Sequence, residues 1–234
     1  MDTLPDPRIP LPVTSLATLM LLGDSRFPAG GHAHSGGVES AHHHGWLAST
    51  EELEEFIDGR LRTSAFTDAV FAAAASRRGC DWLLLDHELG ARTLSPRLRT
   101  ISRSLGRQLL RVGARAWPTI DVDALSAVHV DGPMQPIALG AVAGGAGLGP
   151  REAALCSLHH AVGTYTTAAV RLLGLDPFDV QALAARLAAR LDALAADAVR
   201  LAHLGASELP ATTGLLTDIL AEDHATWEVR LFAS

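Results

Sequence analysis

The sequence predicts an all-α protein: a single compact domain of about nine or ten helices over residues 14–234, behind a flexible leader over residues 1–13. Ala and Leu, both strong helix formers, are abundant, and aromatic residues make up only 5% of the chain. β-Branched and aromatic residues never alternate with polar ones over a run, so no strand is expected. A chain of 234 residues is long enough to bury one large aliphatic core.

Capping residues and glycines delimit the expected helices. Ser49 and Glu52 form a capping box, Ser95-Pro96 starts an arginine-rich helix, and Gly79 and Gly174 end two others. Residues 119–132 are expected to form a loop or short turn. The expected helices are residues 15–22, 38–44, 50–78 with a break at 63–67, 81–92, 96–116, 136–148, 150–173, 179–204 and 213–227.

Charge and composition exclude several functions. The net charge of −7 argues against a nucleic-acid partner, because phosphate binding needs a basic face. All 19 basic residues are Arg, so neither a P-loop nor a pyridoxal-phosphate Schiff base can form. If a nucleotide is hydrolysed in the pathway, a partner hydrolyses it.

The cysteines and the apolar segments point to the cytoplasm. Cys80 and Cys156 are far apart and form no CxxC motif, as expected for thiols in a reducing compartment. Met1 to Pro12 lacks the basic and apolar regions of a signal peptide. The longest apolar run, Ile137 to Gly149, is too short to span a bilayer, so no membrane partner is expected.

Motifs for catalysis are missing, and we expect the chain not to be an enzyme. It contains no G-x-S-x-G and no H-E-x-x-H, and the glycines at 144–149 are interpreted as sites of close helix approach. Ser35 is one conceivable nucleophile, but no base can be assigned to it. An acid–base pair would have to come from the charge cluster Asp81, Asp86, His87 and Glu88, which is more simply the exposed start of a helix.

Five of the eleven histidines lie between positions 32 and 44 and raise the alternative of a nickel-binding metallochaperone. Against it, His42, His43 and His44 are consecutive and on a helix would point about 100° apart. No metal site and no cofactor is therefore expected on this chain. The five histidines are His32, His34, His42, His43 and His44.

Five arginines recur at intervals of four residues along the helix expected at 96–116. Like charges at this spacing repel by about 0.2–0.5 kcal/mol per pair, so the row needs carboxylate partners. Two readings stay open. The arginines pair with Glu51, Glu54 or Glu55 inside the fold, or the middle three form an exposed docking surface for an acidic protein. The row is Arg99, Arg103, Arg107, Arg111 and Arg115, and its middle three are Arg103, Arg107 and Arg111.

Four blocks of sequence resemble the urease accessory protein F family (UreF), in order and spacing over nearly the whole chain. The first contains Asp24, Ser25, Pro28, Gly30, His34, Ser35, Gly37 and Glu39; the second Arg99, Ser102 and Gly106; the third Arg171 and Gln181; and the last Asp218, His224, Arg230, Leu231 and Phe232. The sequence departs from the family pattern at His32, where an aromatic residue is more usual, and at Ala233, where a basic residue is frequent.

The resemblance implies a non-catalytic helical homodimer that assists nickel insertion into apo-urease. Such proteins bridge the D-type (or H-type) accessory protein and the G-type accessory GTPase, and the complex as a whole handles the nickel. The resemblance also implies partner contacts in the last block, in addition to the arginine row. These residues are His224, Arg230, Leu231 and Phe232.

The remaining motif residues receive structural roles. Asp24 or Ser25 can bond nearby backbone N–H groups, and Gly30, Gly36 and Gly37 can adopt positive φ or allow close approach. Glu39 is expected to satisfy a buried donor. Arg171, which lies between Val170 and Leu172 late in an apolar helix, is expected to be partly buried, whereas Arg103 is expected to be exposed.

Overall fold

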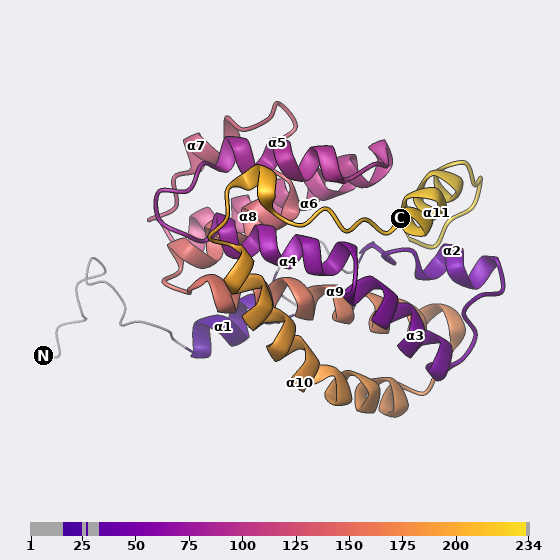
Figure 1. The fold of residues 1–234 in the computed structure, drawn as a ribbon. Coiled ribbons are helices and arrows are strands. Elements are labelled where there is room, and N and C mark those ends of the chain that lie inside the picture. The colour runs from indigo at the N-terminus through magenta and orange to yellow at the C-terminus, as the bar shows by residue number, and fades with distance from the viewer. Residues whose placement is uncertain (1–15, 25–26, 28–32, 233–234) are drawn as a thin grey trace, which may run out of the picture.

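The computed structural model describes residues 16–24, 27 and 33–232, and within them every regular element is a helix. The predicted all-α class is confirmed (Figure 1). The expected leader at 1–13 lies outside the described residues. The helices are α1 Leu16–Gly23, α2 Val38–His43, α3 Thr50–Leu61, α4 Ser64–Ala75, α5 Trp82–Arg92, α6 Pro96–Ala116, α7 Val122–Ser126, α8 Gln135–Gly145, α9 Pro150–Leu173, α10 Pro177–Leu201, the 3₁₀ helix η2 Ala206–Glu208 and α11 Leu215–Ala225.

Helix α4 lies at the centre of the fold, where it contacts α3, α5, α8, α9 and α10 (Figure 1). Nine of its twelve residues are buried, and most of these are alanines. Small side chains let neighbouring backbones come close. A Cβ at Gly140 of α8 would lie 2.2 Å from the carbonyl oxygen of Ala72, and one at Gly144 would lie 2.6 Å from that of Ser76. The expected close helix approach is confirmed at Gly144.

Local signals set the starts of α3 and α6 and the end of α9 as predicted. Glu52 N–H donates to Ser49 Oγ and Ser49 N–H donates to Glu52 Oε2, each at 3.2 Å, which completes the capping box of α3. The Ser95 hydroxyl caps α6 by accepting from Leu98 N–H at 3.1 Å. Gly79 and Gly174 follow helix ends with φ of +74° and +67°, a conformation that glycine adopts at little cost.

Several elements differ from the expectation: besides the three described next, α8 ends at Gly145 and α10 at Leu201, each three residues early, and the 3₁₀ helix η2 was not expected. The segment expected as a loop at 119–132 contains α7, which Asp121 caps and Leu125 anchors in the core. Helix α4 ends at Ala75 instead of Arg78, because the chain turns through Gly79 and Trp82 donates its indole N–H to the Ala75 carbonyl at 2.9 Å. Helix α11 ends at Ala225, and an irregular segment follows it to Phe232.

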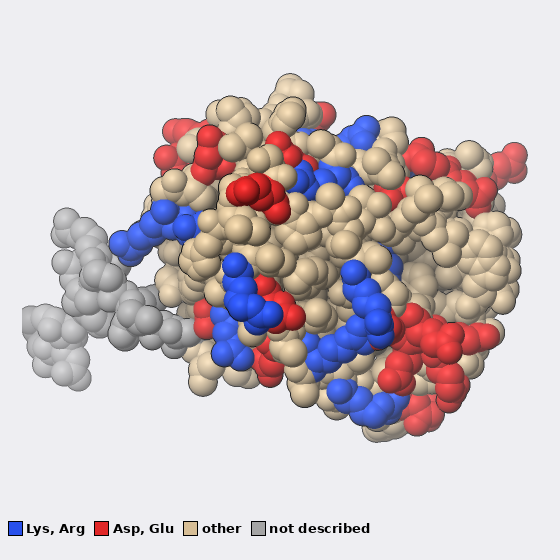
Figure 2. Space-filling model, in the orientation of Figure 1, with Lys and Arg blue, Asp and Glu red and all other residues tan. Residues whose placement is uncertain are grey.

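Charge is unevenly distributed over the surface. On the face shown in Figure 2, acidic side chains gather at the lower right, where α3 and the start of α10 lie. Arginines lie beside them, toward the middle of the molecule. Some of these side chains form ion pairs between α10 and α3: Arg186 lies 2.9 Å from Glu54, and Arg190 contacts Asp58. No helix of the described residues is long and apolar enough to cross a membrane.

Candidate docking surfaces

The segment after α11, residues 226–232 and hereafter the C-terminal tail, is held by one buried carboxylate. Glu39 of α2 accepts hydrogen bonds from the backbone N–H groups of Leu231 (2.7 Å) and Phe232 (3.0 Å). The same carboxylate lies 2.9 Å from Nε2 of His224, which is 2% exposed. Glu39 therefore does satisfy buried donors, as expected, and it fixes the backbone of the tail.

The tail residues divide into buried and exposed ones. Phe232 is buried, whereas Val229 is 82% and Leu231 72% exposed. Arg171, expected to be partly buried, is exposed on α9, and its guanidinium carbon lies 4.6 Å from the centre of the Phe232 ring. His224 and Phe232 were expected to contact a partner, but their side chains face the interior. Of the four residues that the resemblance implied as partner contacts, only Arg230 and Leu231 are exposed.

Arg103 is buried, which corrects the expectation that it belongs to an exposed docking row. It is 8% exposed, its Nη2 lies 2.9 Å from Oδ2 of Asp86, and its Nη1 donates to the carbonyl of Gly132 at 2.6 Å. Asp86 in turn accepts the N–H of Met134 at 2.8 Å. The pair ties α5 and α6 to the segment before α8.

The other arginines of α6 have separate surroundings. Arg99 donates to the carbonyls of Thr93 (2.6 Å) and Leu94 (2.9 Å) and so closes the end of α5. Arg107, Arg111 and Arg115 are exposed, and Arg107 donates to the carbonyl of Asp131. Of the carboxylates proposed as internal partners, Glu54 pairs with Arg186 of α10 instead. The exposed arginines thus occupy the C-terminal half of the helix.

The loop before α2 is built around close packing. Ser35 is fully buried, and its Oγ accepts the N–H of Gly37 at 3.4 Å. Gly36 and Gly37 adopt φ of +62° and +96°, and a Cβ on Gly36 would lie 2.5 Å from the ring of Tyr165. Both glycines are therefore required, as expected. Asp24 and His34 are half-buried and line a cavity; Ser25, Pro28, Gly30 and His32 lie outside the described residues.

Three further motif residues have distinct places. Ser102 Oγ accepts the N–H of Gln135 at 3.0 Å and so links α6 to the start of α8. Gly106 is needed for the same contact, since a Cβ there would lie 2.0 Å from the carbonyl oxygen of Pro133. Gln181 is exposed on α10.

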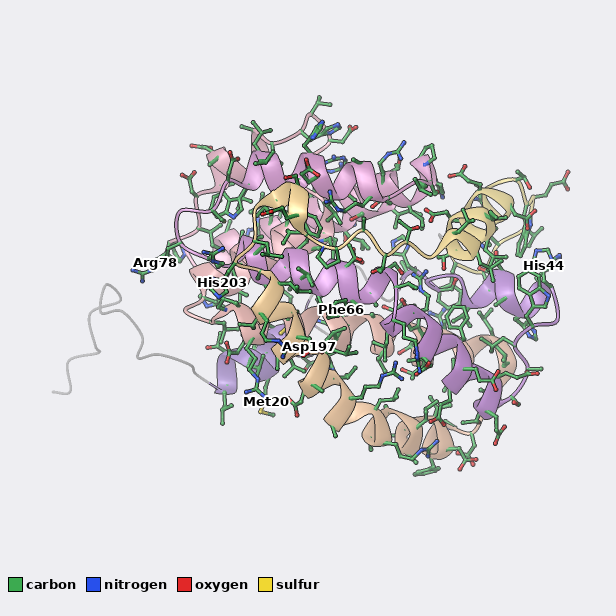
Figure 3. All side chains as sticks on the ribbon, in the orientation of Figure 1. Met20, His44, Phe66, Arg78, Asp197 and His203 are labelled. Atoms are coloured by element: carbon green, nitrogen blue, oxygen red, sulfur yellow. The ribbon has the colours of Figure 1, made fainter. Side chains whose placement is uncertain are left out.

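The histidines at 42–44 turn to three different partners, and His44 lies at the edge of the molecule just after α2 (Figure 3). Nδ1 of His42 lies 2.9 Å from the Leu47 carbonyl, the ring of His43 lies 4.2 Å from Trp227, and Nε2 of His44 lies 3.1 Å from Asp223. Over residues 16–24, 27 and 33–232, no three His, Cys, Asp or Glu side chains are grouped to hold a metal ion.

Three of the four residues weighed as an acid–base cluster have structural contacts, whereas His87 is exposed on α5. Asp81 caps α5 by accepting from Leu84 N–H, Asp86 is paired with Arg103, and Glu88 forms an ion pair with Arg92. Burial raises the pKa of Cys80 to about 11 and that of Cys156 to about 12, so neither thiol is a ready nucleophile.

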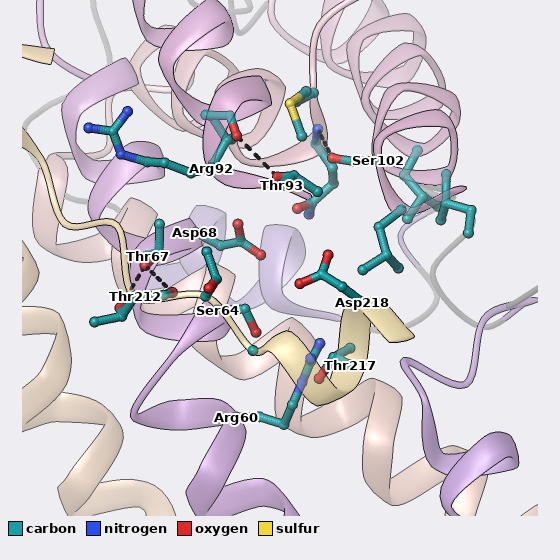
Figure 4. Close-up of a pocket in the computed structure, with 18 residues that line it drawn as sticks. Arg60, Ser64, Thr67, Asp68, Arg92, Thr93, Ser102, Thr212, Thr217 and Asp218 are labelled. Carbon is teal, nitrogen blue, oxygen red and sulfur yellow. Dashed lines mark hydrogen bonds between the residues drawn. The ribbon is translucent and has the colours of Figure 1, made fainter. Parts of the chain in front are cut away.

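A polar cavity that the sequence did not predict lies between α3, α4, α6 and the segment before α11. Arg60, Ser64 and Asp68 line one side of it and Asp218 the other (Figure 4). One signal was available: Asp68 is the single charged residue in α4, a helix otherwise rich in Ala and Phe. Burial raises the pKa of this carboxyl to about 7, although the nearby Arg60 opposes that shift.

The surface of this helical fold is suited to contacts with other proteins. It carries an anchored tail with exposed apolar residues and a row of exposed arginines on α6. The family model described as UreF matches residues 47–188. The chain is 42% identical over 223 residues to a urease accessory protein UreF of Mycobacterium sp. (strain JLS), and 36% identical over 224 residues to that of Mycobacterium tuberculosis (strain ATCC 25618 / H37Rv). Both alignments cover 95% of this chain and 100% of the relative. The chain belongs to the UreF family of urease accessory proteins.

Proposed function

We propose that this chain is a non-catalytic cytoplasmic adaptor that bridges a D-type accessory protein and the G-type accessory GTPase during nickel insertion into apo-urease. Membership of a urease accessory family supports the setting. The observation that carries the adaptor role is the C-terminal tail, whose backbone Glu39 fixes while Val229 and Leu231 project outward.

The tail is proposed as the contact for the D-type protein. Two large apolar side chains, Val229 and Leu231, flank Arg230 and are both exposed. Because two backbone N–H groups of the tail are already bonded to Glu39, less ordering free energy is lost on binding than for a free chain end.

The exposed arginines of α6 are proposed as the contact for the GTPase. Arg107, Arg111 and Arg115 present positive charge on a protein whose net charge is −7, so they favour an acidic partner surface. If the chain binds one nucleotide state of the GTPase better, that nucleotide must strengthen docking by the same factor. An adaptor can thus modulate the GTPase without a catalytic group of its own.

A second copy of the chain is proposed to cover α11. Leu215, Leu216 and Ile219 share one face of this helix and are each more than half exposed. Such a face supports the homodimer that the family resemblance implies. Nickel is proposed to be handled by the whole complex, since His42, His43 and His44 turn to separate partners.

The test is a pull-down of the D-type protein by the full-length chain. Deletion of residues 224–234 is unsuitable, because it also removes the buried His224 and Phe232. Leu231→Asp instead changes one exposed side chain, and Val130→Asp, at a residue that is 95% exposed, is the matched control. We expect Leu231→Asp to lose most of the captured protein and Val130→Asp to retain it. Equal capture by both variants would contradict a docking role for the tail.

A further inference from the structure

The polar cavity beside α4 has the size of a site for a small ligand. Its volume is about 190 Å³, and it lies where α3, α4, α6 and residues 212–218 meet (Figure 4). Pockets for drug-sized ligands have volumes of roughly 300–1,000 Å³, so this cavity suits a single functional group with a short stem. Its wall combines the polar groups with Leu98, Ile101 and Leu105 of α6.

Two hydrogen-bond donors at this cavity have no partner among the residues that the structure describes. Arg60 is fixed at one end, because its Nε donates to the Tyr165 hydroxyl at 3.0 Å and its guanidinium lies over the Tyr165 ring. Its Nη1 is buried and, like the buried Ser64 hydroxyl, forms no hydrogen bond within the described structure. Buried polar atoms are rarely left unpaired, and an arginine N–H can only donate. A hydrogen-bond acceptor placed in the cavity would satisfy both Arg60 Nη1 and Ser64 Oγ.

Two acidic residues, Asp68 and Asp218, also line the cavity. Oδ1 of Asp218 is already engaged by the N–H of Ser95 at 2.9 Å. Desolvation by burial is the main effect on Asp68, and raises its pKa to about 7; Arg60 acts in the opposite direction. Near neutral pH a large share of molecules therefore carries Asp68 protonated, as a third donor that points into the cavity (Figure 4). A cation would meet the fixed charge of Arg60.

We propose that this cavity binds a carboxylate group, which Arg60 Nη1 and Ser64 Oγ hold by hydrogen bonds. A carboxylate offers two acceptor oxygens to these donors, and bonds to a charged acceptor are stronger than neutral ones. The group comes either from a free small acid or from an acidic side chain of a partner. The site is separate from the C-terminal tail, so it stands or falls independently of the proposed adaptor function.

The test is a titration of the full-length protein with sodium acetate against sodium chloride at constant ionic strength. Backbone amide NMR shifts of residues 60–68 and 212–218 report binding at the cavity. We expect saturable shifts with a Kd on the order of millimolar, as fits a ligand of four heavy atoms. Ser64→Ala and Arg60→Gln should each weaken binding at least about fivefold. Arg62→Gln, at a neighbouring arginine that is exposed, should leave the Kd unchanged.

Two further arms identify the ligand. Asp68→Asn keeps a neutral donor and should bind acetate as well as the wild type or better. An acetylated and amidated Gly-Asp-Gly peptide that binds no more weakly than acetate assigns the carboxylate to a partner side chain, and acetate binding alone assigns it to a free acid. Absence of saturable shifts with both probes overturns the proposal. So does equal weakening in Arg62→Gln, or binding of Mg²⁺ that Asp68→Asn abolishes.

Discussion

Glu39 and His224, from α2 and α11, form a buried pair in which the carboxylate oxygen Oε2 lies 2.9 Å from the imidazole Nε2. The carboxylate also accepts the backbone N–H groups of Leu231 and Phe232. One side chain near the start of the chain thus positions its end. Together with the burial of Phe232, this relationship explains how the tail can present Leu231 in a fixed orientation.

We expect Glu39→Ala to release the tail. The chain contains no Lys, so trypsin cuts only after arginine, and Arg230 lies within the tail. Loss of the carboxylate frees the backbone N–H groups and leaves the buried His224 without its acceptor, at a cost of about 1–3 kcal/mol in unfolding free energy. Mass spectrometry after brief trypsin treatment should show faster cleavage at Arg230. Glu55→Ala, at an exposed glutamate, is the control, and equal cleavage in both would count against the anchor.

Arg103 and Arg171 should differ in the direction opposite to that expected from the sequence. Arg103→Ala leaves the buried Asp86 without its ion-pair partner and should cost about 3–5 kcal/mol in unfolding free energy. Arg171→Ala removes an exposed cation–π contact with Phe232 and should cost under about 1 kcal/mol. Urea unfolding followed by circular dichroism measures both. A small loss at Arg103 would mean that the pair with Asp86 adds little to the fold.

Asp68 should make stability depend on pH. The pKa of its carboxyl is about 7 in the folded protein against 3.8 for the unperturbed group, so the folded state binds more protons between these values. The unfolding free energy of the wild type should therefore fall relative to that of Asp68→Asn as the pH rises from about 4 to 7, by up to about 4 kcal/mol, and level off above. A pH-independent difference between the two proteins would argue that Asp68 stays ionised.

Nickel should bind the isolated chain weakly. The side chains of His42, His43 and His44 face the Leu47 carbonyl, Trp227 and Asp223, so they do not converge. Calorimetry of tag-free protein with Ni(II) should give a Kd above roughly 10 µM, equivalent to a binding free energy of only about −7 kcal/mol. A submicromolar site that disappears on mutation of His32 and His34 would support a metallochaperone instead.

The sequence predicted those parts of the fold that local signals determine. The capping box at Ser49 and the caps at Asp81 and Ser95 mark helix starts, because each needs only residues within one turn. Helix α7 was missed because five residues are too few to show a helical period.

Tertiary packing decided the rest. The arginines of α6 share one spacing, so the sequence could not tell that Arg103 meets Asp86 of α5 while Arg111 faces solvent. The cavity was hidden for the same reason. Arg60, Asp68 and Asp218 come from three helices, and only the folded chain places the last of them opposite the other two.

Reconstitution of the complex tests the adaptor role most directly. The measurement is the amount of G-type GTPase that co-purifies with a tagged D-type protein when the two are expressed with and without this chain. The account predicts that the GTPase is retained only when the chain is present, and that charge reversal at Arg107 and Arg111 releases it, more strongly at low salt. Retention of the same amount of GTPase without the chain would contradict a bridging function.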